Sequence, residues 1–128
     1  MDDRTMLELA AKAAGMQWST SSLITHDGLW ITYPSVKTHW NPLTDDGDAL
    51  RLVVAIGFSD EEGVSIFLAD KEDPTVVVRK GGKAGAMELA GNDPYAATRR
   101  AITRAAAEIQ LAKEKQNEPK NTEISQGY

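Results

Sequence analysis

The apolar positions near the start of the chain recur at the spacing of an α-helix. Between residues 3 and 14, apolar side chains repeat at intervals close to 3.6 residues, and acidic residues that suit a helix N-terminus come first. The repeat stops at Gly15, a residue type that commonly ends helices. The pattern predicts a first helix over residues 3–14.

The pattern then changes to short runs of residues that favour β-strands. Two such runs, Leu23 to Thr25 and Leu29 to Tyr33, are joined through Asp27-Gly28. Asp-Gly is a strong hairpin signal because both residues tolerate a positive φ. The sequence predicts a first hairpin here, followed by an aromatic-rich loop over residues 34–42.

A second helix is predicted over "DALRLVVAIG", which ends at Gly57. Residues 44–46 offer N-terminal caps for it. Apart from Arg51 the segment is apolar nearly all round. We therefore expect this helix to be covered on more than one side.

Two further β-rich runs predict a second hairpin. Val64 to Ala69 and Thr75 to Arg79 are separated by a segment whose Asp73-Pro74 favours a turn. The glycine-rich link that follows leaves room for one more strand at Met87 to Ala90.

The third helix has the clearest start signal in the chain. Asp93 can cap it, Pro94 suits its first turn, and the pattern continues to about Lys113. On a helical wheel, Arg100 and Arg104 lie on one side and Arg99 lies at the edge of the apolar face. The residues expected to meet the sheet are Tyr95, Thr98, Ile102, Ala105, Ala106 and Ile109.

Together these elements predict one α+β domain over residues 1–113. An antiparallel sheet of hairpins must cover its apolar face, so we expect it to pack with the three helices as an α-β-α layered sandwich. Residues 114–128 are polar and show no periodicity, which predicts a disordered C-terminal tail.

Composition and charge limit the classes of function. The chain is 41% hydrophobic and 26% charged, has no cysteine, and has no apolar run approaching the roughly 20 residues of a membrane span. The acidic N-terminal residues do not resemble a secretory signal, so we expect a cytoplasmic protein. A net charge of −5 argues against general coating of duplex nucleic acid, and any anion site must be local.

Arg100 and Arg104 are the leading candidates for such a local site. Like charges four residues apart destabilise a helix by roughly 0.2–0.5 kcal/mol, and an anion held between them would reverse that sign. Paired guanidiniums also suit phosphate, because each offers a rigid fork of donors. The alternative is a solvated face on which both arginines pair with Glu108 or water.

The basic stretch "RKGGKAG" adds Lys80 and Lys83 as candidates. Its amides could wrap a phosphate as a lid over the anion, although the stretch lacks the GxxxxGK followed by Ser or Thr of a Walker A loop. The alternative is a mobile surface loop without a binding role.

The two histidines do not complete a catalytic pattern. Phosphoesterases that cut cyclic nucleotides can use two His-x-Thr/Ser pairs, but here Gly28 and Asn41 stand two positions after His26 and His39. Neither metal-ligand spacing nor a serine nucleophile elbow accompanies them. We expect no catalysis, no metal and no cofactor.

Two of the three tryptophans invite specific predictions. Strand alternation predicts that Trp30 fills the core. For Trp40, which lies in the "HWNP" segment, core packing, a subunit contact and a platform for a nucleotide base all remain open.

Three landmarks carry a resemblance to a known family. They are His39-Trp40-Asn41-Pro42, the run from Asp45 to Asp48 that leads into "DALRLVVAI", and "DPYAATRRAI" at the start of the last helix. With them the chain resembles the small phage proteins of the α-β-α sandwich type, over residues 39–57 and 93–109. Within that group it is similar to the phage Thoeris anti-defence sponges.

The resemblance implies a non-catalytic protein that captures cyclic ADP-ribose isomers made by host TIR enzymes. It also implies a hexamer, and some members hold cyclic trinucleotides of the CBASS system as well. The family's pocket uses two arginines one helical turn apart on the last helix, a spacing that Arg100 and Arg104 match, and Arg51 falls near another phosphate contact. No residue can be matched to the expected stacking aromatic.

Two hypotheses follow. The first is a phage counter-defence sponge that sequesters cyclic nucleotide signals without cleaving them. The alternative is a phage accessory protein that inhibits a host protein or nuclease through an acidic surface, formed by Asp45, Asp46, Asp48, Asp60, Glu61 and Glu62.

Overall fold

The computed structural model describes residues 1–18, 28–32, 37–81 and 84–117 of the 128-residue chain. Its helices are α1 (Asp3–Ala13), α2 (Asp46–Gly57) and α3 (Pro94–Gln116). Its strands are β1 (Gln17–Trp18), β2 (Leu29–Thr32), β3 (Lys37–Trp40), β4 (Val64–Phe67), β5 (Thr75–Lys80) and β6 (Ala84–Leu89).

The described strands form two antiparallel sheets, in the orders β1-β2-β3 and β4-β5-β6. In the first sheet Leu29 lies opposite Trp40. In the second sheet Ile66 lies opposite Val78, and Val77 lies opposite Met87. Each sheet is a simple meander, so sequence neighbours are also neighbours in space.

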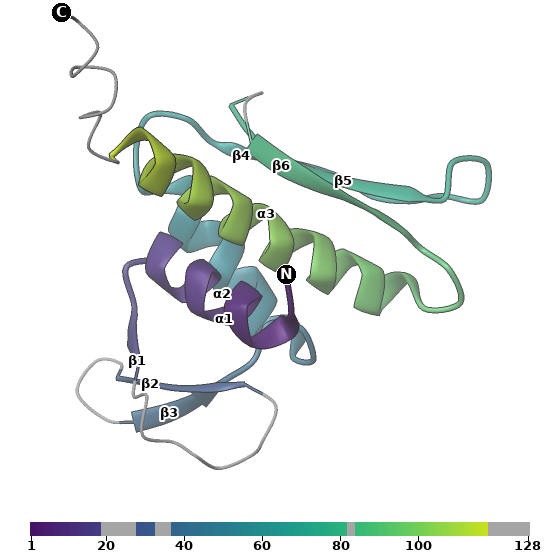
Figure 1. Cartoon of the computed structure of the whole chain (residues 1–128). Helices are drawn as coiled ribbons and strands as arrows, with labels where there is room; N and C mark the ends of the chain where they lie inside the picture. Colours follow the sequence, from purple (N-terminus) through teal and green to yellow (C-terminus); the bar gives the residue numbers. More distant parts are fainter. Residues whose placement is uncertain (19–27, 33–36, 82–83, 118–128) are drawn as a thin grey trace, which may run out of the picture.

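The helices lie between the two sheets (Figure 1). The β4–β6 sheet covers one side of α3, while α1 and α2 pack on the other side and separate α3 from the β1–β3 sheet. One apolar cluster joins both sheets to all three helices. The chain therefore has a single core, with α3 at its centre.

Each helix is preceded by an aspartate whose carboxylate accepts hydrogen bonds from free backbone N–H groups of the first turn. Asp2 caps α1, Asp45 caps α2, and Asp93 accepts from both Tyr95 and Ala96 at the start of α3. Each cap of this kind contributes about 1 kcal/mol to stability. These local signals explain why the helix starts could be predicted.

The α+β class, the three helices and the second hairpin are confirmed. The sheets, however, lie outside the helices and do not form one central layer. This order follows from the alanine-rich α3, which is buried along much of its circumference between residues 101 and 109. Small side chains let a helix on one side and a sheet on the other approach its backbone closely.

The prediction of a loop over residues 34–42 is wrong for residues 37–40, which form β3. The prediction that Trp30 fills the core is also wrong. Leu29 and Ile31 point into the core, and because side chains alternate along a strand, Trp30 lies on the opposite face. There its ring packs edge-on against that of His39, with centroids 5.6 Å apart.

The prediction that α2 is covered on more than one side is wrong, because its buried residues lie on one face. Leu52 and Ile56 are buried, but Leu50 is 63% exposed and Val54 is 47% exposed. An apolar face of α2 thus remains open.

The wheel prediction for α3 is confirmed for Ile102, Ala105, Ala106 and Ile109, which are buried. It is wrong for Tyr95, which is 72% exposed because the first turn of α3 extends beyond the core. The helix also continues to Gln116, three residues past its predicted end, so residues 114–116 are helical.

Several predictions fall outside the described residues. These are the strand at Leu23 to Thr25, the roles of His26 and Lys83, and the tail from residue 118 onward. Among the described helices, none is long and apolar enough to span a bilayer.

Candidate functional site

The three arginines of α3 all make ion pairs, but with different elements of the fold. Arg99 is the most enclosed, with 18% of its side chain exposed. Its Nε donates to the carbonyl of Leu43 at 2.9 Å and its Nη1 donates to Asp46 Oδ1 at 2.7 Å. Arg99 therefore ties α3 to α2 and to the loop before it.

Arg100 and Arg104 lie on the half-exposed strip of α3 that the helical wheel predicts. Arg100 donates to Asp3 Oδ1 at 3.1 Å, and Arg104 donates to the Glu88 carboxylate on β6. Their partners belong to α1 and to the second sheet, and neither pairs with Glu108 in this structure. The side chains of Arg100 and Arg104 are 41% and 37% exposed.

Arg104 also lines an open pocket beside β5 and β6, which a second arginine lines as well. The pocket has a volume of about 370 Å³. Arg79 of β5 lines it, as do Gly85 and Met87 of β6. Within the described part of the chain no carboxylate pairs with Arg79, and Glu88 does not line the pocket. The pocket therefore combines two cationic side chains with an apolar wall.

Sequence reasoning noted Arg79 only as part of a basic cluster. The signal that could have singled it out is strand alternation, because residues 79 and 80 must point to opposite faces of the sheet. Arg79 is exposed, whereas Lys80 is only 5% exposed and faces the core.

The ammonium group of Lys80 is held by neighbouring oxygens. Its Nζ donates to Asp60 Oδ1 at 2.8 Å and to the carbonyl of Glu62. The hydrogen bond from Lys80, followed by that from the Glu62 backbone N–H, holds the pKa of Asp60 below its ordinary value of 3.8. Lys80 therefore has a structural role, because it ties β5 to the segment between α2 and β4.

Arg51 and Trp40 line one cleft of about 600 Å³ between α2 and the first sheet. Trp40 contributes little open surface there, since it is 2% exposed and belongs to the core. Its burial supports the packing interpretation over that of a platform for a base. Arg51 donates to Asp48 Oδ1 at 2.8 Å, and this bond raises the pKa of Arg51 above its ordinary value.

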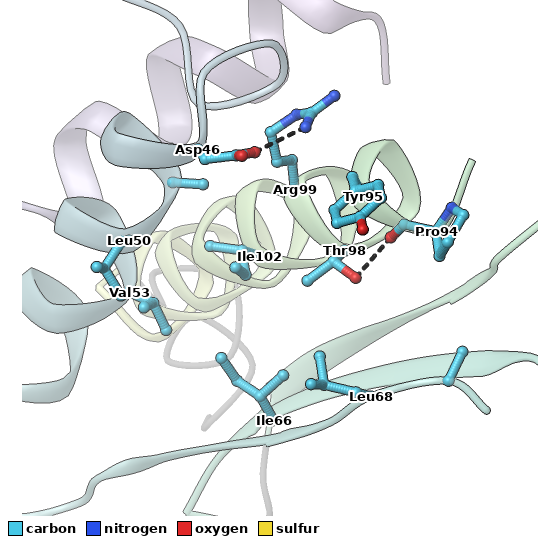
Figure 2. A pocket seen from close by; sticks show the side chains of 12 residues that line it. Asp46, Leu50, Val53, Ile66, Leu68, Pro94, Tyr95, Thr98, Arg99 and Ile102 are labelled. Carbon is cyan, nitrogen blue, oxygen red and sulfur yellow. Dashed lines mark hydrogen bonds and ion pairs between the residues drawn. The ribbon is translucent and has the colours of Figure 1, made fainter.

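Another hollow lies on the opposite side of α2, between α2, α3 and β4 (Figure 2). Its volume is about 430 Å³. Figure 2 shows Ile66 and Leu68 directed toward α3 across this groove, with Leu50 and Val53 on the side of α2. The Asp46–Arg99 ion pair bridges the two helices beside it. The groove is lined mainly by apolar side chains. The charged groups of Asp46 and Arg99 beside it are already paired with each other.

No group of three or more potential metal-ligating side chains gathers among the described residues. His39 is exposed and its ring contacts Trp30.

Comparisons with family models, with curated proteins and with solved structures find no match for this chain. Its fold and its pockets are therefore the basis for proposing a function.

Proposed function

We propose that this chain is a non-catalytic binding protein that captures a cyclic nucleotide signal inside a bacterial host cell and withholds it from an immune effector. The resemblance of residues 39–57 and 93–109 to phage sponges suggests cyclic ADP-ribose isomers and cyclic trinucleotides as ligands, and a hexameric assembly. Capture of this kind works by mass action, so it requires tight binding and slow release but no bond cleavage.

The observation that carries the proposal is the pair of arginines in the pocket beside β6. Arg104 and Arg79 come from a helix and a strand, yet they line the same space of about 370 Å³. Two guanidinium forks can bind the oxygens of a phosphate, while Val77 and Met87 offer an apolar wall to a ribose or a base. Because Arg has five N–H donors, Arg104 can hold Glu88 and still donate to an anion.

Arg100 lies one turn before Arg104 on the same half-exposed strip of α3. A ligand with two phosphates could extend from the β6 pocket toward Arg100 by competing with Asp3, an exposed partner. In this proposal Arg104 is the central contact, with Arg79 and Arg100 on either side.

The acidic-surface alternative loses support because most of those acids have partners within the chain. Asp45 caps α2, Asp46 pairs with Arg99, and Asp60 pairs with Lys80. Asp48 accepts from both Arg51 and the backbone N–H of Asn41. The structural roles account for their presence without a host partner.

Isothermal titration calorimetry of the purified chain with cyclic ADP-ribose isomers and cyclic trinucleotides tests the proposal. Arg79→Ala and Arg104→Ala should each weaken binding by about 10- to 100-fold, because each removes a charge-assisted hydrogen bond to the ligand. The matched control is Arg4→Ala, which removes an exposed arginine paired with Glu8 on α1 and should leave affinity unchanged.

Mass spectrometry of the ligand released by heating completes the test, and an unchanged mass is expected. Absence of binding to every compound, equal affinity of the two pocket variants and the native chain, or recovery of a cleaved ligand would each refute the proposal.

A further inference from the structure

The ion pair between Arg104 and Glu88 lies beside the pocket that Arg79 and Arg104 line. Glu88 is opposite Val76 of β5, which is buried, so the Glu88 side chain extends from the face of the sheet that packs on α3. Its carboxylate accepts a hydrogen bond from Arg104. The Glu88 side chain is 19% exposed, so the pair is partly shielded from solvent. Glu88 therefore places a negative charge directly beside the guanidinium of Arg104.

A bound phosphate should leave this ion pair in place. Taking Arg104 away from Glu88 would leave a partly buried carboxylate without its counter-charge, which is strongly unfavourable. Arg104 has five N–H donors, so it can keep Glu88 as a partner and still donate to a ligand. Glu88 does not line the pocket. It therefore acts on a ligand through its charge and not through contact.

These three side chains together carry one positive charge in excess. Arg79 and Arg104 line the pocket, and Glu88 offsets the charge of Arg104. Arg79 has no carboxylate partner in the part of the chain that the structure describes, so its charge is the one left over. A Cβ at Gly85 would lie 3.2 Å from Cγ of Arg79, so the stem of Arg79 lies close to β6.

An excess of one positive charge favours a phosphate that carries one negative charge. Attraction to the pocket grows in proportion to the charge of the ligand, whereas the cost of removing that charge from water grows with its square. A phosphate that links two groups, as in a cyclic nucleotide, carries one negative charge. A terminal phosphate carries about two at neutral pH, so it loses more hydration than this pocket can offset.

We infer that Glu88 determines the specificity of the pocket and makes it select phosphodiesters over phosphomonoesters. The pocket then takes cyclic nucleotides in preference to linear nucleotides that end in a phosphate. This inference rests on the proposed function, because it concerns the ligand of the same pocket.

A protein that captures a cyclic signal needs selectivity of this kind. Linear nucleotides such as AMP and ATP share the base and the ribose of such a signal and would otherwise occupy the pocket. Specificity is a difference of affinities, and a repulsive group placed against the wrong ligand is one way to obtain it. The carboxylate of Glu88 is that repulsive group. The net charge of −5 acts in the same direction, because its field repels ligands with several negative charges most strongly.

Calorimetric titration of the full chain with 3′,5′-cyclic AMP and with 5′-AMP tests the inference. The two probes share base and ribose, and at about pH 8 the phosphate of AMP carries two charges while that of cyclic AMP carries one. The native chain should bind cyclic AMP more tightly. Glu88→Gln keeps the shape of the side chain and removes its charge. For a carboxylate about 7 Å from the phosphate in water, this change should tighten binding of cyclic AMP by about threefold and of AMP by about tenfold.

Two control variants separate this effect from net charge and from shape. Glu8→Gln changes the net charge equally but removes a carboxylate of α1 that pairs with Arg4, and it should leave the ratio of the two affinities unchanged. Glu88→Asp keeps the charge and should keep the native preference.

A native preference for AMP, equal gains for both probes in Glu88→Gln, or the same change of ratio in either control would overturn the inference alone. Failure of the native chain to bind either probe would also overturn it. The titrations with cyclic ADP-ribose isomers and cyclic trinucleotides would then still decide the proposed function separately.

Discussion

Replacing Arg99 by methionine should destabilise the protein more than replacing Arg100, its neighbour on α3. The substitution keeps much of the apolar stem and removes the guanidinium. The Leu43 carbonyl then loses a donor 2.9 Å away, and Asp46 loses a donor 2.7 Å away.

The two lost hydrogen bonds contribute unequally to the free energy of unfolding. A hydrogen bond from a charged donor to a partly buried carbonyl contributes about 1.5–3 kcal/mol. The Asp46 side chain is 78% exposed, so its ion pair is screened by solvent and contributes about 0–1 kcal/mol. We therefore expect the free energy of unfolding to fall by about 2 kcal/mol in Arg99→Met, and mainly through the loss at Leu43.

Equilibrium unfolding in urea, followed by circular dichroism, measures this difference. Asp46→Asn should cost less than about 1 kcal/mol, since it removes only the exposed pair and an acid at the start of α2. Arg100→Met should also cost little, because the side chains of Arg100 and Asp3 are 41% and 62% exposed and solvent screens their ion pair. A loss below about 0.5 kcal/mol in Arg99→Met, or an equal loss in Asp46→Asn, would show that the Leu43 contact does not hold α3 in place.

Two further predictions concern the second sheet and its connection to α2. Gly85→Ala should destabilise the protein by about 2 kcal/mol or more, because the new Cβ would lie 2.2 Å from the Val78 carbonyl oxygen, whereas Gly63→Ala meets no atom within 4 Å and should change the urea midpoint little. Asp60→Asn should lower stability at neutral pH, and the gap to the native chain should close on acidification. The carboxylate has a folded pKa below 3.8, so its contribution is complete above that value and disappears as the pH falls through the folded pKa. Urea titrations at a series of pH values would contradict this second prediction if the gap stayed constant into acid.

Local signals predicted much of the fold. Asp93 followed by Pro94 specified the start of α3, and the β-branched runs around Asp73-Pro74 specified the β4–β5 hairpin. Each of these features depends on residues within a few positions of one another, so one sequence is enough to detect it.

The errors arose where distant parts of the chain decide the outcome. Residues 37–40 form a strand because β2 offers them a partner, and the "HWNP" segment alone gives no sign of that pairing. The order of layers depends on which elements cover the alanines of α3, which periodicity cannot specify.

The candidate site shows the same limit. The wheel placed Arg100 and Arg104 on one strip of α3, but it could not show that their carboxylate partners are Asp3 and Glu88. It also could not bring Arg79 to the same pocket as Arg104, because that proximity depends on how α3 packs on β6.

The central position of α3 also bears on when the protein can fold during synthesis. Every other described helix and strand precedes α3 in the chain, yet both α1 and the second sheet use α3 as their main packing surface. A nascent chain that has released residues 1–90 from the ribosome still lacks the surface on which those elements assemble. Folding of the whole domain must therefore wait until α3 has emerged, and until then the apolar faces of α1 and β5 are open to chaperones.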